Sequence, residues 1–167
     1  SVTLLAVSKT FGADAVREAV TAGEHRFGEN YVQEAIEKIA ALADLRAQIE
    51  WHLIGPLQSN KTRVVAEQFD WVHSVDRLKI AQRLSEQRPA HLAPLQLCLQ
   101  VNISGEPSKS GLAPEARIIA DYVEALGGRP ESSVLGFGSK APAPWAAFVN
   151  GSLGHMLDYD DVGAGGH

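Results

Sequence analysis

The stretch "VTLLAVSKTFGADAVREAVTAG" (Val2–Gly23) decides the fold class, because it combines one strand pattern with one helix pattern. Its opening run, Val2–Val7, is aliphatic and too short for a helix, so it predicts a strand. The second part puts Val16, Ala19 and Val20 on one helical face, and a glycine ends the pattern as a helix stop. The stretch therefore predicts one βα unit.

The same strand-then-helix order recurs along the chain, at intervals of roughly 20–26 residues. Further strands are predicted at 24–30 ("EHRFGEN"), 49–55 ("IEWHLIG"), 71–76 ("WVHSVD") and 95–103 ("LQLCLQVNI"). Five strands, each but the last followed by a helix, predict parallel βαβ units with both faces of the sheet covered. Two architectures fit this pattern, a (β/α)₈ barrel and an open doubly wound sheet. No G-x-G-x-x-G follows the first strand, which disfavours a dinucleotide-binding site.

The composition is that of an ordinary globular domain, with 167 residues, 45% hydrophobic residues and a net charge of −5. The negative charge argues against a nucleic-acid partner, and no apolar run approaches the ~18 residues of a membrane span. The single cysteine, Cys98, excludes an internal disulfide framework and fits a reducing compartment, so we expect a cytoplasmic protein. No pattern predicts an oligomeric state.

The βα rhythm ends at about Pro114. Residues 114–130 predict a helix, residues 132–144 an extended piece with a Pro-rich turn, and residues 145–161 ("WAAFVNGSLGHMLDYDD") another helix. A sixth βα unit of the earlier kind is not expected. We predict two parts, a part built of βα units over 1–114 and a mainly helical part over 115–167. A strand at 132–138 and the helix from Trp145 are candidates to cover the open edge and a face of the sheet.

Polar side chains follow the predicted strands at their C-terminal ends, where active sites of α/β proteins collect. Ser8 and Lys9 come directly after the first strand. Burial at such a position disfavours the ammonium form of a lysine, and a neutral lysine amine can form a Schiff base with an aldehyde. The alternative is a lysine that extends to solvent from a strand end.

Other polar residues have simpler interpretations. His52 and His73 sit in apolar strands, and we expect packed, hydrogen-bonded histidines. A metal site is not predicted, because no histidine pair has i, i+4 spacing and Cys98 has no thiol partner. The loop "GEPSKSG" (105–111) lacks P-loop spacing, so a flexible loop is favoured over an anion site. The carboxylates of "DYDD" (158–161) fit a solvated helix end or a general base.

Five motifs together resemble the pyridoxal 5′-phosphate homeostasis (YggS-type) family over about residues 1–114: "LLAVSKTF", "HRFGENYVQEA", "IEWHLIGPLQSNK", "VHSVD" and "LQVNISGEPSKSG". The resemblance implies a barrel like the N-terminal domain of alanine racemase, with pyridoxal 5′-phosphate held as an aldimine on Lys9. It places Asn30, His52, Ser74 and Asn102 around the cofactor. It implies a role in vitamin B6 homeostasis, and leaves open whether the protein is also an enzyme.

A complete barrel takes about 250 residues, and 200 at the short end. We therefore expect an incomplete (β/α)₈ barrel of five βα units followed by a mainly helical tail. The resemblance also implies that the family's phosphate-binding motifs and its first helix are missing from this chain.

The tail, about residues 117–167, resembles the N-terminal part of the 2-methylcitrate dehydratase / aconitate decarboxylase family (MmgE/PrpD), most specifically in "APWAAFVNGSLGHMLDYDD". This second resemblance implies active-site roles for Asp158 and His167. The favoured prediction is a cofactor-binding protein that uses Lys9. The alternatives are a lyase of small polycarboxylic acids and a fusion without function. A natural fusion, an assembly error and a designed chimera all fit such a composite.

Overall fold

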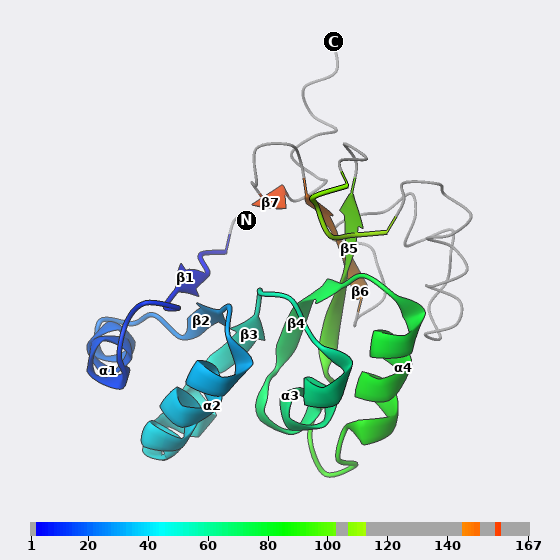
Figure 1. Cartoon of the computed structure of the whole chain (residues 1–167). Coiled ribbons are helices and arrows are strands. Elements are labelled where there is room, and N and C mark those ends of the chain that lie inside the picture. Colours follow the sequence, from blue (N-terminus) through cyan, green and yellow to red (C-terminus); the bar gives the residue numbers. More distant parts are fainter. Residues whose placement is uncertain (1–2, 103–106, 113–144, 151–155, 158–167) are drawn as a thin grey trace.

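The computed structural model describes residues 3–102, 107–112, 145–150 and 156–157. Strands and helices alternate through the first hundred residues, as the sequence predicts (Figure 1). They are β1 (Ala6–Val7), α1 (Ala13–Thr21), β2 (Arg26–Glu29), α2 (Val32–Ala41), β3 (Glu50–Leu53), α3 (Thr62–Gln68), β4 (Trp71–Val75), α4 (Leu78–Gln87) and β5 (Gln96–Asn102). Two 3₁₀ turns, Ala43–Gln48 and Ser59–Lys61, precede β3 and α3, and the strands β6 (Trp145–Asn150) and β7 (Met156–Leu157) follow β5.

The strands form one sheet in the order β1-β2-β3-β4-β5-β6-β7. Each pair from β1–β2 to β5–β6 is parallel, and β7 pairs with β6 in the antiparallel sense. A doubly wound sheet reverses its strand order at a switch point, whereas a barrel adds each strand to the same side. The uninterrupted order therefore favours part of a barrel wall over the open doubly wound alternative.

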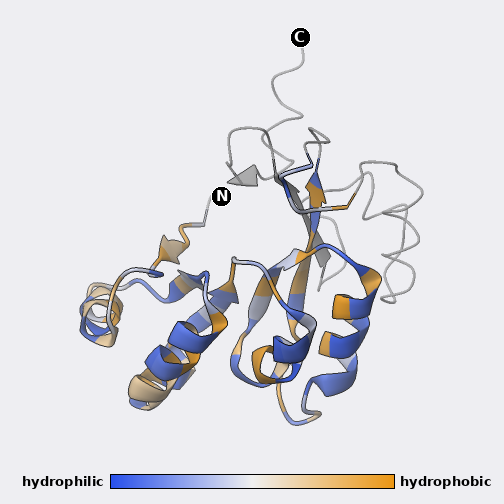
Figure 2. Ribbon diagram, viewed as in Figure 1, coloured by the Kyte–Doolittle hydropathy of each residue, from blue (hydrophilic) through white to orange (hydrophobic). Residues whose placement is uncertain are grey.

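The hydrophobic core lies between the strands and the helices. Residues of a strand alternate between faces, and Phe27, Trp51, Leu53 and Val72 share one face through their pairing register. All four are buried, and the Phe27 and Trp51 rings lie 6.0 Å apart. Helix α3 packs between α2 and α4, and Figure 2 shows apolar and polar stripes on these helices. The buried apolar residues of these helices are Val32, Ala35, Ile39, Val65, Ala66, Ile80, Ala81 and Leu84.

The helix predicted over 145–161 is wrong over the two segments that the structure describes there, Trp145–Asn150 and Met156–Leu157, because both are strands. Residues predicted to begin a helix at Trp145 instead form β6, which pairs with β5 from Leu97–Trp145 to Asn102–Asn150. Without β6, strand β5 would present an unpaired edge, and aromatic and β-branched residues such as those of "WAAFVN" favour strands. The sheet thus has a sixth parallel strand, which the sequence interpretation did not expect. The helix predicted over 114–130 and the extended piece at 132–144 lie outside the described residues.

Gly55 marks a close approach of two chain segments. The backbone N–H groups of Ile54 and Gly55 both donate to the carbonyl oxygen of Glu29, at N–O distances of 2.9 and 3.4 Å. A Cβ atom at Gly55 would lie 2.1 Å from the carbonyl oxygen of Asn30. The turn after β3 therefore touches the end of β2 at a point where only a hydrogen fits.

We predict that Gly55→Ser lowers the free energy of unfolding by about 1–3 kcal/mol, because overpacking against backbone forces the turn away from Asn30. Gly12→Ser is the matched control: a Cβ there meets nothing within 4 Å, and Gly12 is the N-cap of α1, a position that serine favours. Urea unfolding of the two variants measures the difference. Equal stability of both variants would contradict the close approach.

Candidate functional site

Lys9 lies in the turn that connects β1 to α1, two residues after the end of β1, and its side chain is exposed. Of the two alternatives for this lysine, burial and extension to solvent from a strand end, the structure shows the second. The physical reason is its position: β1 is an edge strand and only two residues long, so few neighbours surround the turn that follows it. Asn30 follows the adjacent strand, β2, and is half-buried. The parallel pairing of β1 with β2 brings these two predicted site residues to the same edge of the sheet.

The residue before Lys9 belongs to a buried polar cluster of Ser8, Glu29 and Lys38. Lys38 Nζ lies 2.6 Å from Glu29 Oε1 and 2.7 Å from the carbonyl oxygen of Ser8. The Ser8 hydroxyl donates to the same Glu29 oxygen at 2.5 Å. Glu29 is fully buried, and Ser8 and Lys38 are 4% and 9% exposed. Groups from the end of β1, from β2 and from α2 therefore meet at one carboxylate.

The ion pair between Glu29 and Lys38 lies on the helix side of the sheet. Glu29 pairs in register with Leu53 and alternates with Gly28, so it shares a face with the core residues Phe27 and Leu53. An ion pair whose partners leave water costs desolvation energy, and removing one partner of such a pair typically destabilises a protein by about 3–5 kcal/mol. The cluster is thus a fixed support behind the strand ends.

Ser8 was predicted as a polar residue at a strand end, whereas Lys38 was not predicted as part of any site. The signal was present in the helix pattern. Lys38 lies three residues after the buried Ala35, on the apolar face of α2 that also contains Ile39. A lysine on the buried face of a helix that follows a strand-end glutamate indicates an internal ion pair.

His52 and His73 form a second cluster, on the face of the sheet opposite the core. His52 Nδ1 lies 2.8 Å from His73 Nε2, and His52 Nε2 lies 2.9 Å from Glu50 Oε1. The His52 ring stacks on Trp71, with centroids 5.5 Å apart and planes 6° apart. Arg26 Nε lies 3.2 Å from the same Glu50 oxygen. The prediction of packed, hydrogen-bonded histidines is confirmed.

The hydrogen bonds of His52 restrict its role. With Glu50 ionised, His52 Nε2 must carry a proton to donate to the carboxylate, so neutral His52 accepts at Nδ1 from the Nε2–H of His73. Both ring nitrogens of His52 are then engaged by protein groups. Burial lowers the pKa of His52 despite the opposing effect of Glu50. Burial, followed by repulsion from His52, lowers the pKa of His73 to about 3.

The remaining predicted site residues are spread along the sheet. Ser74, in β4, is buried, and its hydroxyl has no hydrogen-bond partner among the described residues. Asn102 ends β5, where its Nδ2 donates to the Lys109 carbonyl and its backbone N–H to the Leu112 carbonyl. Four strand steps of about 4.8 Å separate β1 from β5, or about 19 Å along the sheet. The structure thus groups Lys9 with Asn30 and His52 with His73, and leaves Asn102 on a distant strand.

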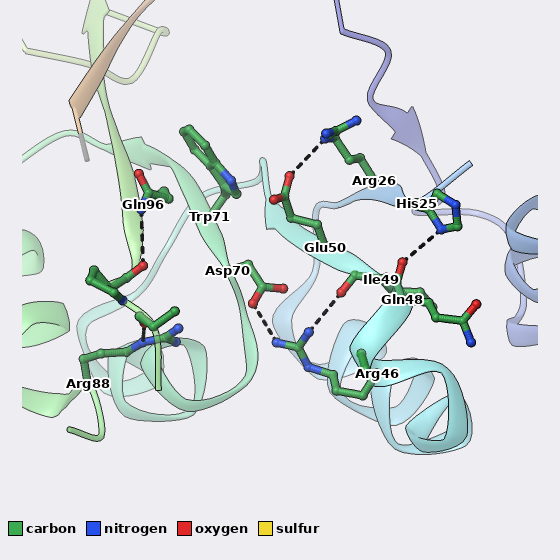
Figure 3. A pocket seen from close by; sticks show the side chains of 13 residues that line it. His25, Arg26, Arg46, Gln48, Ile49, Glu50, Asp70, Trp71, Arg88 and Gln96 are labelled. Carbon is green, nitrogen blue, oxygen red and sulfur yellow. Dashed lines mark hydrogen bonds and ion pairs between the residues drawn. The ribbon is translucent and has the colours of Figure 1, made fainter. Parts of the chain in front are cut away.

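A hollow of about 490 Å³ lies at the opposite end of the strands from Lys9 (Figure 3). Arg26, Arg46, Arg88 and Trp71 contribute to its wall. Each arginine is already engaged: Arg26 with Glu50, Arg46 with Asp70 at 2.8 Å, and Arg88 with carbonyl oxygens. Burial lowers the pKa of Arg88. The arginines of this hollow, at the N-terminal ends of the strands, are therefore already paired with protein groups. The hollow is separate from the C-terminal strand ends, where the sequence predicts site residues.

Two features that would indicate a metal or a membrane are absent from the part of the chain that the structure describes. Within it, no three His, Cys, Asp or Glu side chains are grouped as a metal site would require. No helix among these residues combines the length and the apolar character needed to cross a bilayer. Cys98 is buried in β5. Asp158 and His167, the residues of the lyase alternative, lie outside the described ranges.

Comparison with known proteins reveals close relatives of the first part of the chain. The pyridoxal phosphate homeostasis protein of Pseudomonas aeruginosa is 71% identical over 115 residues, which cover 69% of this chain and 49% of the relative. The protein of the same name from Escherichia coli K12 is 50% identical over 149 residues, or 89% of this chain and 62% of the relative. The first part of the chain is similar to the pyridoxal phosphate homeostasis proteins. The chain spans about half the length of the P. aeruginosa relative.

Solved structures support the same likeness. PipY of Synechococcus elongatus, in a structure with PLP bound, has a TM-score of 0.65 and 44% identity, covering 74% of this chain and 57% of PipY. Alanine racemase from E. faecalis has a TM-score of 0.52 at 21% identity, covering 74% of this chain and 33% of the racemase, which shows likeness of fold alone. The barrel-type fold and the resemblance to the homeostasis family are confirmed.

The second resemblance is confirmed as well. The family model of the MmgE/PrpD N-terminal domain matches residues 109–166. That match begins inside the loop tied to Asn102, while the E. coli alignment covers 89% of the chain and so extends past residue 114. The two similarities therefore overlap.

The histidine cluster predicts a loss of stability in acid. His73 stays neutral in the folded chain, whereas in the unfolded chain it takes up a proton. The free energy of unfolding is therefore unaffected by His73 above pH 6.5 and declines as the pH falls toward 3. The loss from His73 is at most about 1.4 kcal/mol per pH unit in this window. Urea unfolding at pH 7.5, 5.5 and 4.5 measures it.

The control for this prediction is the exposed His25. We expect His73→Gln to reduce the slope of stability against pH, and His25→Gln to leave the slope unchanged. A His73→Gln variant that is folded at pH 7.5 and keeps the full slope would show that another group causes the acid sensitivity.

Proposed function

We propose that this chain binds pyridoxal 5′-phosphate at the C-terminal edge of its sheet, with Lys9 as the residue that engages the aldehyde. One structural observation carries the proposal: Lys9 presents an exposed primary amine directly after Ser8, a residue held by the buried Glu29 and Lys38. The names of the relatives and the PLP-bound PipY structure support the choice of ligand. The proposed role is to carry or buffer this aldehyde as part of vitamin B6 homeostasis.

The residues of the chain fit the aldehyde end of the ligand. Bound pyridoxal phosphate supplies an electron-withdrawing ring and an aldehyde that combines with primary amines. Lys9 supplies the amine, and the half-buried Asn30 offers an amide at the same edge. His52 contributes through its packing against Trp71, because its nitrogens are engaged by Glu50 and His73. Ser74 and Asn102 remain proposed ligand contacts from β4 and β5.

We place the ligand function in residues 1–114 and assign the protein to the cytoplasm, in keeping with a net charge of −5 and one buried cysteine. The partner is a small molecule, without a nucleic-acid or membrane partner. We do not propose the lyase alternative with Asp158 and His167, because the P. aeruginosa and E. coli relatives, which match 69% and 89% of this chain, are both named pyridoxal phosphate homeostasis proteins. The helix over residues 114–130 and the extended piece over residues 132–144 stay predictions.

The function is tested by trapping the ligand. Pyridoxal phosphate is added to the purified chain, the visible absorbance is recorded, and borohydride is used to fix any link between lysine and ligand. Peptide mass spectrometry then locates it. We expect about one fixed ligand per chain, on Lys9, because this exposed amine lies beside Asn30 at the C-terminal edge of the sheet.

Lys9→Ala should remove the labelling, whereas Lys79→Ala should not, since Lys79 is an exposed lysine on α4 away from the site. Labelling scattered over several surface lysines, or equal labelling of the Lys9→Ala variant, would overturn the proposed function.

A further inference from the structure

We infer that Glu29 and Lys38 are positioning residues, which act through Ser8 to hold the turn that presents Lys9. The expected effect on ligand affinity rests on the proposed function. The expected effect on the order of the turn does not, because it can be measured in the protein without ligand. Neither Glu29 nor Lys38 is placed in contact with the ligand, because Glu29 points to the core side of the sheet and both side chains are buried.

Ser8 is fixed at every polar atom. Its N–H donates to the Gly28 carbonyl at 2.9 Å, and its hydroxyl donates to Glu29. Its carbonyl oxygen accepts from Lys38 Nζ at 2.7 Å and from the Phe11 N–H at 2.9 Å. The next residue, Lys9, is exposed. A fully bonded residue therefore adjoins a solvent-accessible amine, the arrangement needed to aim a reactive side chain from a rigid base.

The strand that leads to Lys9 cannot supply this rigidity by itself. Strand β1 has two residues, pairs with β2 through Ala6–Phe27 and Val7–Gly28, and forms the edge of the sheet. Short edge strands open easily because few bonds and contacts hold them. Lys38 reaches across from α2 and ties the end of β1 to the carboxylate at the end of β2. The position of the turn thus depends on a side chain thirty residues away in the sequence.

The charge of the pair and its hydrogen bonds can be separated by mutation. Glu29 Oε2 is buried without a hydrogen-bond partner, so in the free protein Lys38 balances the carboxylate through Oε1. Lys38→Met leaves an uncompensated buried charge, which threatens folding. The double variant Glu29→Gln with Lys38→Met removes both charges, yet still lacks the donor to the Ser8 carbonyl. The double variant therefore tests the positioning of the turn in a protein without an uncompensated buried charge.

The first measurement uses the free protein. Hydrogen exchange of the Ser8 and Phe11 amides reports the order of the turn, since both amides donate in its hydrogen-bond network. We expect exchange about tenfold faster or more in Lys38→Met and in the double variant, and partial restoration in Lys38→Arg. The control is Asp44→Asn, which breaks the exposed Arg17–Asp44 pair and should leave both amides unchanged.

The second measurement is the apparent affinity for pyridoxal phosphate and the absorbance of the bound ligand as a function of pH, with each variant folded by circular dichroism. We expect the double variant to bind about tenfold more weakly or worse, with a shifted pH profile, because small misplacement of a reacting group is costly. Unchanged amide exchange, or unchanged affinity and pH profile, would overturn the inference. If neither the unmodified chain nor any variant binds the ligand, but hydrogen exchange of the Ser8 and Phe11 amides changes as expected, the proposed function fails and the positioning of the turn stands.

Discussion

The ion pair between Glu29 and Lys38 is the constraint on which the ligand-presenting end of this sheet depends. A fully buried carboxylate is tolerated only where a cation and hydrogen-bond donors face it, and here Lys38 and Ser8 do so at a single oxygen. Because these groups come from β1, β2 and α2, satisfying the carboxylate also sets the relative positions of three elements. The exposed turn with Lys9 takes its place from this internal arrangement.

The two ends of the strands have different characters. At the C-terminal ends, an exposed amine stands over a buried polar support. At the N-terminal ends, arginines brace the loops through Asp70, Glu50 and backbone carbonyls around a hollow. In barrel folds the C-terminal face carries function and the opposite face contributes stability. This sheet follows the same division, with the exposed Lys9 amine at the C-terminal ends of the strands and the paired arginines at the N-terminal ends.

Much of the fold could be predicted from the sequence, because short aliphatic runs followed by helical periodicity give parallel βα units almost irrespective of side-chain detail. Convergence of strand-end residues was also predictable for Lys9 and Asn30, which follow adjacent strands. The exposure of Lys9 was not predictable, because it depends on which strand forms the edge of the sheet. Lys38 was not predicted, because it lies within a helix, whereas the predicted site residues lie in strands or shortly after them. The helix expected at Trp145 was a wrong prediction, because the local sequence pattern contains no information about the edge of β5. Residues Trp145–Asn150 pair with that edge as strand β6.

The most direct test is a crystal structure of the chain grown with pyridoxal phosphate. We predict electron density continuous from Lys9 Nζ to the ligand at the end of β1, with Lys38 still hydrogen-bonded to the Ser8 carbonyl and to Glu29. Ligand bound in the hollow beside Arg46 and Trp71, or a Lys38 side chain turned away from Ser8 while Lys9 carries the ligand, would contradict it.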